Sequence, residues 1–327
     1  MLIGIIQNKN KEYINMSRVK FTVFSDLHHH PAWYKADAPE RLSAIQKRAL
    51  EGNSSFLLHL GDFSHKPSAC PELIRQYREF QIPGYFVLGN HEFDIESFET
   101  VLEAMGMEKG YYFFDREGFR FIILDENYFR EYPGVYFHYS ERNYFDHPKC
   151  RDWMPPEEIQ WLRETVMDSP YPCILASHAA IDYPVKPESE IKCKEEIAGI
   201  IRESQGTAGQ VILCLNGHYH RSGLDIIDGV PRLDVNSATF NWVTKAHYLF
   251  PEKELYKQYE NYGNMVIYER PVSAEIIIDT AEQSIEIIGM EGSFFHGITT
   301  EDTGNSSGNR LCTPDMLSAK VRYGTGK

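Results

Sequence analysis

Five short apolar runs in this chain each lead into residues that can bind a metal ion. The runs are VKFTVF, SFLLHL, YFVL, CILA and QVILCL, and their composition is typical of buried parallel strands. The residues that follow them are Asp26 and His28, Asp62, Asn90, His178, and His218 and His220. In an open α/β sheet, ligands bind beyond the carboxyl ends of the strands. The pattern therefore predicts that residues far apart in sequence converge at one edge of a sheet.

The residue types at these positions favour a catalytic metal site. Carboxylate and amide oxygens and imidazole nitrogens, with no cysteine among them, suit Mn, Fe or Zn in a hydrolytic centre better than a structural thiolate site. No single residue is decisive, because a lone His near a strand end is more often a core or surface residue, and Asp26 could cap a helix. The evidence is the combination: D-x-H, G-D, G-N-H-E, S-H and G-H-x-H occur in this order, each after an apolar run.

This motif set resembles that of the calcineurin-like metallophosphoesterase superfamily, in its branch of small bacterial-type phosphoesterases and phosphodiesterases, from about Val19 to about Ser237. The resemblance implies an α/β fold: a four-layer α/β/β/α sandwich of two packed mixed β-sheets flanked by helices, with the metal site at the C-terminal ends of the strands. It also implies a metal-dependent phosphoric ester hydrolase with two divalent metal ions (Mn, Fe or Zn). The implied substrate is a small phosphomonoester or phosphodiester, with a nucleotide as one candidate.

The resemblance further implies a role for each motif residue. Each metal would have four ligands, with Asp62 shared: Asp26, His28, Asp62 and His220 for one, and Asp62, Asn90, His178 and His218 for the other. His91 resembles the family's catalytic histidine, which stands beside the substrate phosphate and stabilises the transition state or protonates the leaving oxygen; an orienting role is the alternative. In such sites two ions about 3.5–4 Å apart support in-line attack of a metal-bound hydroxide on phosphorus.

Departures from family patterns concern the residues after Asp62. Protein serine/threonine phosphatases of the superfamily continue this motif as G-D-x-V-D-R-G, whereas this chain has G-D-F-S-H-K-P, which argues against that activity. Purple acid phosphatases place a tyrosine ligand where this chain has His65. His65 could be an extra ligand or could support one, but an exposed loop histidine is the simpler interpretation. His29 could face the substrate or the solvent.

Two other functions use the same motifs. A metal-dependent, exonuclease-like nuclease is one alternative, but the formal net charge of −14 argues against broad binding to nucleic acid or to an anionic membrane surface. A non-catalytic binding scaffold on the same fold is another, and it should have lost ligands, whereas this set is intact along with His91. The expected partner is therefore a small phosphorylated substrate. The sequence does not indicate the oligomeric state.

Strand and helix patterns alternate through most of the chain. Strands are expected at 19–24, 56–60, 85–88, 119–125, 173–176 and 211–215, and helices at 39–50, 71–80, 95–105, 156–167 and 190–203. After His220 the pattern changes to antiparallel hairpins that would complete a second sheet. The aromatic segment 127–154 has no clean period, and it is either an insertion or lid near the site or an ordinary packed surface loop.

The expected organisation is one metallophosphoesterase domain over residues 18–297, with insertions at about 127–154 and 241–264. Residues 1–17 would form an N-terminal arm, although Leu2–Ile6 could instead add an edge strand, and Met16 could mark the start of the functional protein. The polar segment 298–327 is expected to be a mobile C-terminal tail. No apolar stretch is long enough to span a membrane. The six cysteines lack paired spacing, which favours a reducing, cytoplasmic location.

Overall fold

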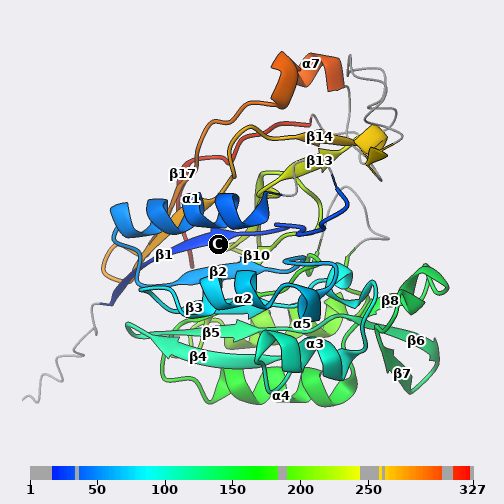
Figure 1. The fold of residues 1–327 in the computed structure, drawn as a ribbon. Helices are drawn as coiled ribbons and strands as arrows, with labels where there is room; N and C mark the ends of the chain where they lie inside the picture. The colour runs from blue at the N-terminus through cyan, green and yellow to red at the C-terminus, as the bar shows by residue number, and fades with distance from the viewer. Residues whose placement is uncertain are drawn as a thin grey trace, which may run out of the picture.

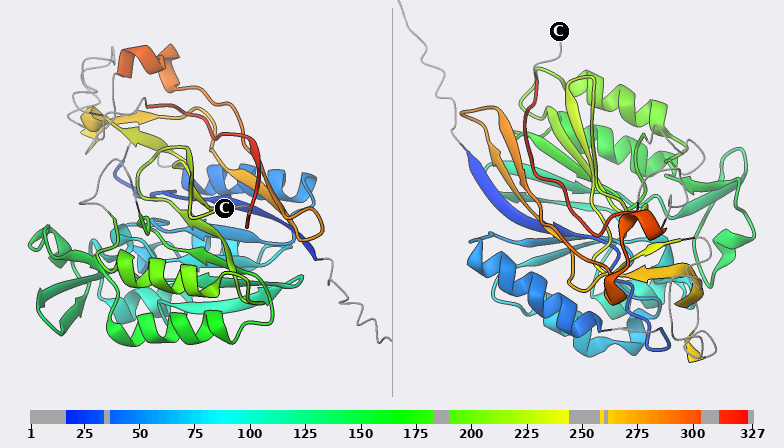
Figure 2. Two further views of the ribbon diagram at one scale, coloured as in Figure 1. Left: turned by 180° about the vertical axis from the view of Figure 1, so that it is seen from behind. Right: turned by 90° about the horizontal axis from the view of Figure 1, so that it is seen from above.

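Two six-stranded mixed β-sheets pack against each other at the centre of the computed structural model, which describes residues 17–33, 37–182, 190–243, 258–259, 262–303 and 312–324. The first sheet has the order β17-β16-β15-β1-β2-β3, and the second has the order β11-β12-β10-β9-β5-β4 (Figure 1). Helices cover the outer face of each sheet, and the four layers are visible in the right-hand view of Figure 2. This arrangement confirms the predicted α/β/β/α sandwich.

The first sheet combines three parallel strands with three antiparallel ones. The parallel strands are β1 (Arg18–Phe24), β2 (Leu57–Leu60) and β3 (Gly84–Val87). The antiparallel strands are β15 (Ala274–Asp279), β16 (Ser284–Ile288) and β17 (Ala319–Arg322). The helices α1 (Ala38–Glu51), α2 (Pro71–Arg78) and α3 (Phe98–Met105) follow the three parallel strands in turn and pack on the outer face.

The second sheet has four parallel strands between two antiparallel edge strands. The parallel strands are β5 (Phe119–Ile123), β9 (Cys173–Ala176), β10 (Val211–Asn216) and β12 (Val230–Asp234). The edge strands are β4 (Tyr112–Arg116) and β11 (Gly223–Ile227). The helices α4 (Pro156–Met167) and α5 (Lys194–Ser204) pack on its outer face.

Successive side chains along each central strand point to opposite faces of its sheet, and both faces are buried. In β1, Val19, Phe21 and Val23 point into the core between the sheets, whereas Phe24 packs against the helices. In β9, Ile174 and Ala176 face the core between the sheets, while Cys173 and Leu175 face α4 and α5. A strand buried on both faces reads as a continuous apolar run. Because the strands themselves are apolar, the polar residues that could form a functional site lie at the strand ends.

The segment 127–154 folds into a small sheet of its own with a 3₁₀ turn. Its strands are β6 (Tyr128–Tyr132), β7 (Val135–His138) and β8 (Arg151–Trp153), in the order β7-β6-β8, and the turn is η3 (Asn143–Phe145). Figure 1 shows this sheet at the side of the molecule toward which β1 runs. The sequence could not distinguish an insertion near the site from a surface loop; the buried Tyr139 and Tyr144 join the hydrophobic cluster between the first sheet and its helices, so the segment packs onto the domain.

Two expectations for the C-terminal half need correction. The hairpins after His220 do not all join the second sheet: β11 and β12 do, but β15 and β16 extend the first sheet beside β1. Residues 319–322, expected in a mobile tail, form edge strand β17, and Cys312, Met316 and Tyr323 are buried in the core between the sheets. Period-two alternation identifies a strand but does not say which sheet edge accepts it.

Several predicted features lie outside the part of the chain that the structure describes. They are residues 1–16, with the possible strand Leu2–Ile6, and most of the segment 241–264. The described ends of that second segment are β13 (Phe240–Trp242) and β14 (Met265–Ile267), which pair with each other. None of the helices in the described ranges has the length and apolar composition needed to cross a lipid bilayer.

Glu158 in the first turn of α4 is buried, and its position carries a prediction about stability. Its Oε1 accepts a hydrogen bond from the Asp125 backbone N–H at 2.8 Å, while its Oε2 has no hydrogen-bond partner in the described structure. Burial, and then the carboxylate of Asp125, raises the pKa of Glu158 well above its ordinary value. A raised folded-state pKa means that the protonated form contributes stability below the unfolded pKa. That contribution is lost as the pH rises through the folded pKa.

The variant Glu158→Gln keeps the carbonyl acceptor and removes the titration. Its melting temperature should exceed that of the wild type at pH 8.5, with a smaller difference at pH 5.5, measured by differential scanning fluorimetry. Glu157→Gln, on the exposed side of the same turn, changes the net charge equally and is the matched control. A pH-independent difference for Glu158→Gln would show that this carboxyl does not titrate between folded and unfolded states.

Candidate metal centre

Five of the seven predicted ligands lie at positions where the backbone turns sharply after a strand. Their φ angles are positive: 53° at Asp26, 51° at His28, 60° at Asp62, 69° at His218 and 47° at His220. This left-handed region costs about 1–2 kcal/mol for a residue with a Cβ, and such residues cluster at functional sites. The turns bring these side chains together beyond the carboxyl ends of the strands, as the sequence predicted. The expectation that they meet at the edge of one sheet was wrong, because β1 and β2 belong to the first sheet and β10 to the second.

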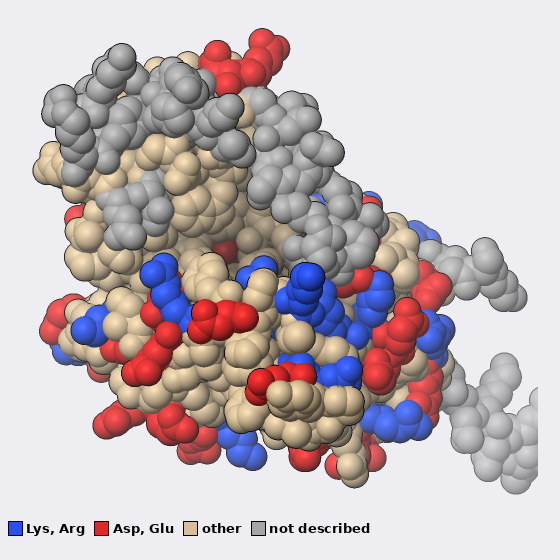
Figure 3. Space-filling model, turned by 90° about the vertical axis from the view of Figure 1, so that its right-hand side faces the viewer, with Lys and Arg blue, Asp and Glu red and all other residues tan. Residues whose placement is uncertain are grey.

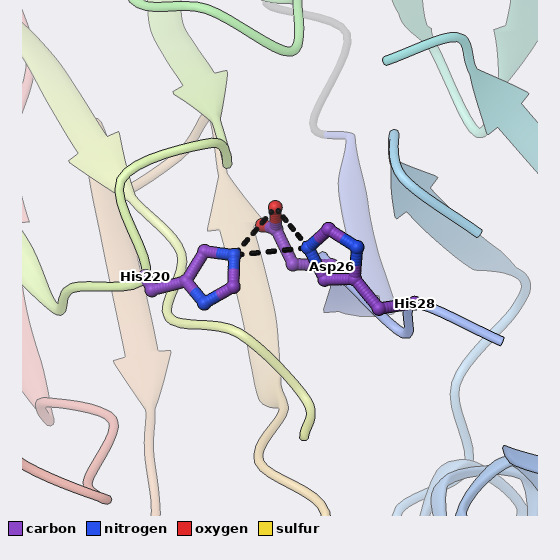
Figure 4. A group of neighbouring side chains, drawn as sticks. All are labelled: Asp26, His28 and His220. Atoms are coloured by element: carbon purple, nitrogen blue, oxygen red, sulfur yellow. Dashed lines mark hydrogen bonds and ion pairs between the residues drawn. The ribbon is translucent and has the colours of Figure 1, made fainter. Parts of the chain in front are cut away.

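Three of these side chains form the first donor group: Asp26 and His28 after β1, and His220 after β10 (Figure 4). The His28 Nε2 and His220 Nε2 atoms are 3.0 Å apart, and Asp26 Oδ1 lies 3.6 Å and 3.3 Å from them. All three residues are buried. The strands that carry them belong to different sheets, so this group joins the two halves of the sandwich.

The proton positions in this group leave three lone pairs facing one another. The other ring nitrogen of His220, Nδ1, lies 2.7 Å from the Phe240 carbonyl, so it carries the proton and Nε2 is free. Burial lowers the pKa of His28 to about 4, which keeps that ring neutral. Asp26 Oδ1 has no hydrogen-bond partner in the described structure. Converging acceptors without protons fit a cation between them.

Asp62, His178 and His218 form the second donor group. Asp62 Oδ2 lies 3.0 Å from His178 Nε2 and 3.7 Å from His28 Nε2, so one carboxylate touches both groups. His178 Nδ1 donates to the Leu60 carbonyl at 2.7 Å, so Nε2 is the ring atom that faces Asp62, and His218 Nδ1 lies 3.2 Å from that Nε2. This arrangement of donors fits two cations that share Asp62.

Asn90 belongs to the same edge, in the 3₁₀ turn η2 (Asn90–Phe93) after β3. Its buried Oδ1 has no hydrogen-bond partner in the described structure, whereas its Nδ2 donates to the Tyr144 hydroxyl at 3.3 Å. A buried amide oxygen without a donor fits a ligand position for a cation. All seven residues predicted as ligands therefore lie at this edge of the sandwich.

The charges in the centre favour a positive partner for its carboxylates. Burial alone would raise the pKa of Asp26, but the imidazoles of His220 and His28 more than offset burial and hold it well below the usual range. Burial disfavours a charged His178, yet the Asp62 carboxylate outweighs burial and raises the pKa of His178 well above its ordinary value. Both carboxylates are thus ionised, and a bound cation would replace the protons that they otherwise attract.

Two glycines make room for the centre. A Cβ on Gly89 would lie 2.3 Å from Asp62 Oδ1, and a Cβ on Gly61, where φ is +92°, would lie 2.4 Å from His178 Nδ1. Neither position accepts a side chain without displacing a candidate ligand. The glycines in the G-D and G-N-H-E motifs are therefore required by the packing of Asp62 and His178.

Glu92 holds the loop of Asp62 against the loop of Asn90. Its carboxylate accepts hydrogen bonds from the backbone N–H groups of Asp62, Phe63, Ser64 and Gly89. Four N–H donors favour the ionised carboxylate, while burial and then the nearby Asp62 raise the pKa of Glu92 to about 8. Because Glu92 ties the two loops together, it fixes the distance between Asp62 and Asn90.

His91 and Asp94 lie beside both donor groups. The His91 backbone N–H donates to Asp62 Oδ1 at 2.8 Å, and its Nδ1 donates to Asp94 Oδ2 at 2.8 Å. The imidazole is 19% exposed, whereas His28 and His178 are buried. Burial would lower the pKa of His91, but the carboxylates of Asp62 and Asp94 outweigh it and raise that pKa. His91 is thus more exposed than His28, His178 and His220 and, like the half-buried His218, is a histidine of the centre that a substrate can reach.

His65 is buried, so its interpretation as an exposed loop histidine is wrong. Its Nδ1 donates to Asp94 Oδ2 at 2.6 Å, and its Nε2 accepts from His28 Nδ1 at 3.0 Å. Burial lowers the pKa of His65 to about 3. His65 therefore orients His28 and leaves the Nε2 of His28 free for a cation.

His29 lies outside both donor groups. It lines a cavity of about 240 Å³ together with His65, Ser64, Lys66, Cys70 and Ile95. Its Nδ1 is buried and has no hydrogen-bond partner in the described structure. His29 borders this cavity, and it does not take part in the contacts among the candidate ligands.

Sequence reasoning missed three residues of this centre: Glu92, Asp94 and Tyr144. Glu92 and Asp94 lie one and three positions after His91 in G-N-H-E-F-D, and their short spacing from it was an available signal. Tyr144 donates a hydrogen bond to Asp94 Oδ1 from 50 positions away. Tyr144 is one of several tyrosines in an aromatic segment, and nothing in the sequence distinguishes it from the others.

Comparison with known proteins agrees with the geometry. A sequence profile described as calcineurin-like phosphoesterase matches residues 19–222. No curated protein matches the sequence. A dimetal phosphatase from Danio rerio has a similar fold, with a TM-score of 0.58 and 13% identity over 93% of this chain and 99% of that one. GAP50, the anchor in the inner membrane complex of Plasmodium, has a TM-score of 0.50 and 10% identity over 94% of this chain and 89% of that one. At these identities the likeness concerns the fold alone.

Proposed function

Because this chain belongs to the calcineurin-like phosphoesterase family, we propose that it hydrolyses a small phosphomonoester or phosphodiester with two divalent metal ions. That it is a metal-dependent phosphoesterase follows from the family and from its His and Asp clusters. The observation that carries the proposal is the pair of donor groups that share Asp62. Two cations with a common carboxylate are the arrangement that phosphoester hydrolysis uses.

In this proposal seven side chains hold the cations. The first position is formed by Asp26, His28, Asp62 and His220, and the second by Asp62, Asn90, His178 and His218. When bound, the ions supply Lewis acidity that activates water and neutralise charge on the phosphoryl oxygens. The buried His and Asp side chains provide preformed ligands, and Leu60 and Phe240 carbonyls fix the tautomers of His178 and His220.

His91 supplies the proton in the proposed reaction. Asp94 holds the Nδ1–H of His91, so Nε2 is the ring atom from which a proton can be transferred. The raised pKa of His91 favours the imidazolium form, which can donate a proton from Nε2 to the leaving oxygen. A cation bound at Asp62 would oppose this rise, and Asp94 then becomes the main support for the charged ring.

The charge around the centre suits an anionic substrate. Figure 3 shows a hollow on the face that carries the strand ends, with an acidic group at its floor and Lys and Arg side chains along its lower margin. Arg142 is 58% exposed, and its Nε lies 3.7 Å from Asp94 Oδ1, next to His91. Basic groups at the mouth of a site raise the local concentration of a phosphate ester even on a chain of net charge −14.

Metal removal and substrate comparison test the proposal together. Protein treated with a strong chelator and then desalted should not hydrolyse chromogenic phosphoesters, and added Mn²⁺ should restore turnover. Parallel assays with a chromogenic monoester and diester should separate phosphatase from phosphodiesterase. Full activity of the chelated protein would contradict the proposal. Cleavage of single-stranded oligonucleotides in preference to both small esters would instead support the nuclease alternative.

A further inference from the structure

Tyr144 is the residue of the 127–154 segment that reaches the candidate ligands. It lies in η3 and is 1% exposed, with its ring stacked between Tyr139 at 4.8 Å and Phe145 at 4.5 Å. Its hydroxyl makes two hydrogen bonds, to Asp94 Oδ1 at 2.5 Å and to Asn90 Nδ2 at 3.3 Å. One hydroxyl therefore touches both a candidate ligand and the carboxylate that holds His91.

The direction of these two hydrogen bonds is determined by Asp94. Burial alone would raise the pKa of Asp94, but hydrogen bonds from His65 and His91 outweigh it and hold the pKa well below the usual range. An ionised carboxylate accepts only, so the Tyr144 hydroxyl must donate to it. A phenol keeps its proton at neutral pH. Having one proton, the hydroxyl can only accept from Asn90.

This direction decides which end of the Asn90 amide faces the centre. Because the hydroxyl oxygen accepts, the NH₂ group of Asn90 must point at Tyr144, and the Oδ1 atom must point away from it. That Oδ1 is buried and has no hydrogen-bond partner in the described structure. An amide turned the other way would place N–H donors toward the cation and could not act as a ligand.

We propose that Tyr144 is a positioning residue for the second metal position, because its hydroxyl holds the Asn90 amide with Oδ1 toward the cation. This inference rests on the proposed two-metal site. The inference gives the 127–154 segment a function: its Tyr144 hydroxyl orients the candidate ligand Asn90. Loss of the hydroxyl allows the amide to rotate, and loss of such supporting hydrogen bonds typically weakens metal affinity by about 10- to 100-fold.

Calorimetric titration of the metal-free full chain with Mn²⁺ alone tests this role. In Tyr144→Phe, which keeps the ring and its stacking, binding of the second Mn²⁺ should weaken by about 10- to 100-fold, with the first much less affected. Tyr139→Phe is the matched control. It is equally buried in the same segment, and its hydroxyl donates to Asp152 Oδ1 at 3.0 Å and does not touch a candidate ligand. Unchanged second-site affinity in Tyr144→Phe, or equal weakening in both variants, would overturn the inference.

A double-variant cycle separates amide orientation from a general structural effect. Aspartate at position 90 presents oxygen at both ends and needs no orienting partner, so Tyr144→Phe should cause no further loss of Mn²⁺ affinity in the Asn90→Asp chain. A loss as large as in the parent chain would refute the proposed role. If the wild type binds one Mn²⁺ or none, the two-metal proposal itself fails, which is a distinct outcome.

The wild-type protein provides a test that needs no variant to fold. A crystal structure of the Mn²⁺-loaded chain should show Asn90 Oδ1 at the second cation while Asn90 Nδ2 still donates to the Tyr144 hydroxyl. A second cation bound by Asn90 with this hydrogen bond broken would overturn the inference.

Discussion

Asp62→Asn should abolish turnover and lower the metal content of the purified protein. Asp62 Oδ2 is the atom that lies near both His28 and His178, and its Oδ1 accepts the His91 backbone N–H. An amide in its place offers one oxygen and one NH₂ group, so it cannot bind two cations with two oxygens. The loss in kcat should exceed the roughly 10²- to 10³-fold that follows removal of one electrostatic donor from an active site.

Steady-state assays with added Mn²⁺ and elemental analysis of the purified variant measure the two effects. Asp115→Asn removes a carboxylate on β4 that pairs with Arg120 on β5. It changes the net charge equally and should leave turnover and metal content near the wild-type values. Wild-type turnover in Asp62→Asn would refute the shared carboxylate. Normal metal content with lost turnover would limit Asp62 to a role in the reaction itself.

His91→Ala should depress kcat by about 10²- to 10⁴-fold, the usual contribution of general acid catalysis, while both metals stay bound. The hydrogen bond from residue 91 to Asp62 comes from the backbone and survives the substitution. The side chain donates to Asp94, which no longer has this partner in the variant but still accepts from His65 and Tyr144. The metal ligands should therefore keep their positions.

Metal content and kcat measured on the same His91→Ala preparation distinguish two roles for this residue. His91 also lies within reach of His28 and Asp62, in a group that could itself hold an ion. Loss of one metal per chain would therefore identify His91 as a ligand and not a proton donor. His296→Ala, at an exposed position, controls for the general effect of removing an imidazole.

The fold was predictable because its signals are local. The parallel strands other than β12 are recognisable as apolar runs, and the helix α4 begins at Pro156 and ends at Met167 as its pattern indicates. Two features were not predictable. The edge strand β4 lies in a segment without clear alternation, and β17 lies beyond a polar stretch that resembles a tail. Edge strands bury fewer side chains, so their sequences are less constrained.

The candidate ligands were also predictable, because each follows a strand whose carboxyl end must lie at one edge of the sheet. The residues that hold them were not. His65 appeared to be an exposed loop residue, yet it is buried and hydrogen-bonded to Asp94 and His28. Glu158 appeared as an ordinary residue of the first turn of α4, yet its carboxyl accepts from the Asp125 backbone N–H. These contacts depend on side-chain directions that spacing in the sequence does not specify.

By itself, the sequence determined most of the central strands and helices and the set of Asp, Asn and His residues that follow the strands, since each of these depends on residues close together in the chain. The tertiary structure decided the order of the strands in the two sheets. Only the tertiary structure decided that Tyr144 lies between Asn90 and Asp94. The physical reason is that a hydrogen bond between distant segments requires their relative position to within a few tenths of an ångström. That position results from the packing of the whole core and is not encoded in any short stretch of sequence.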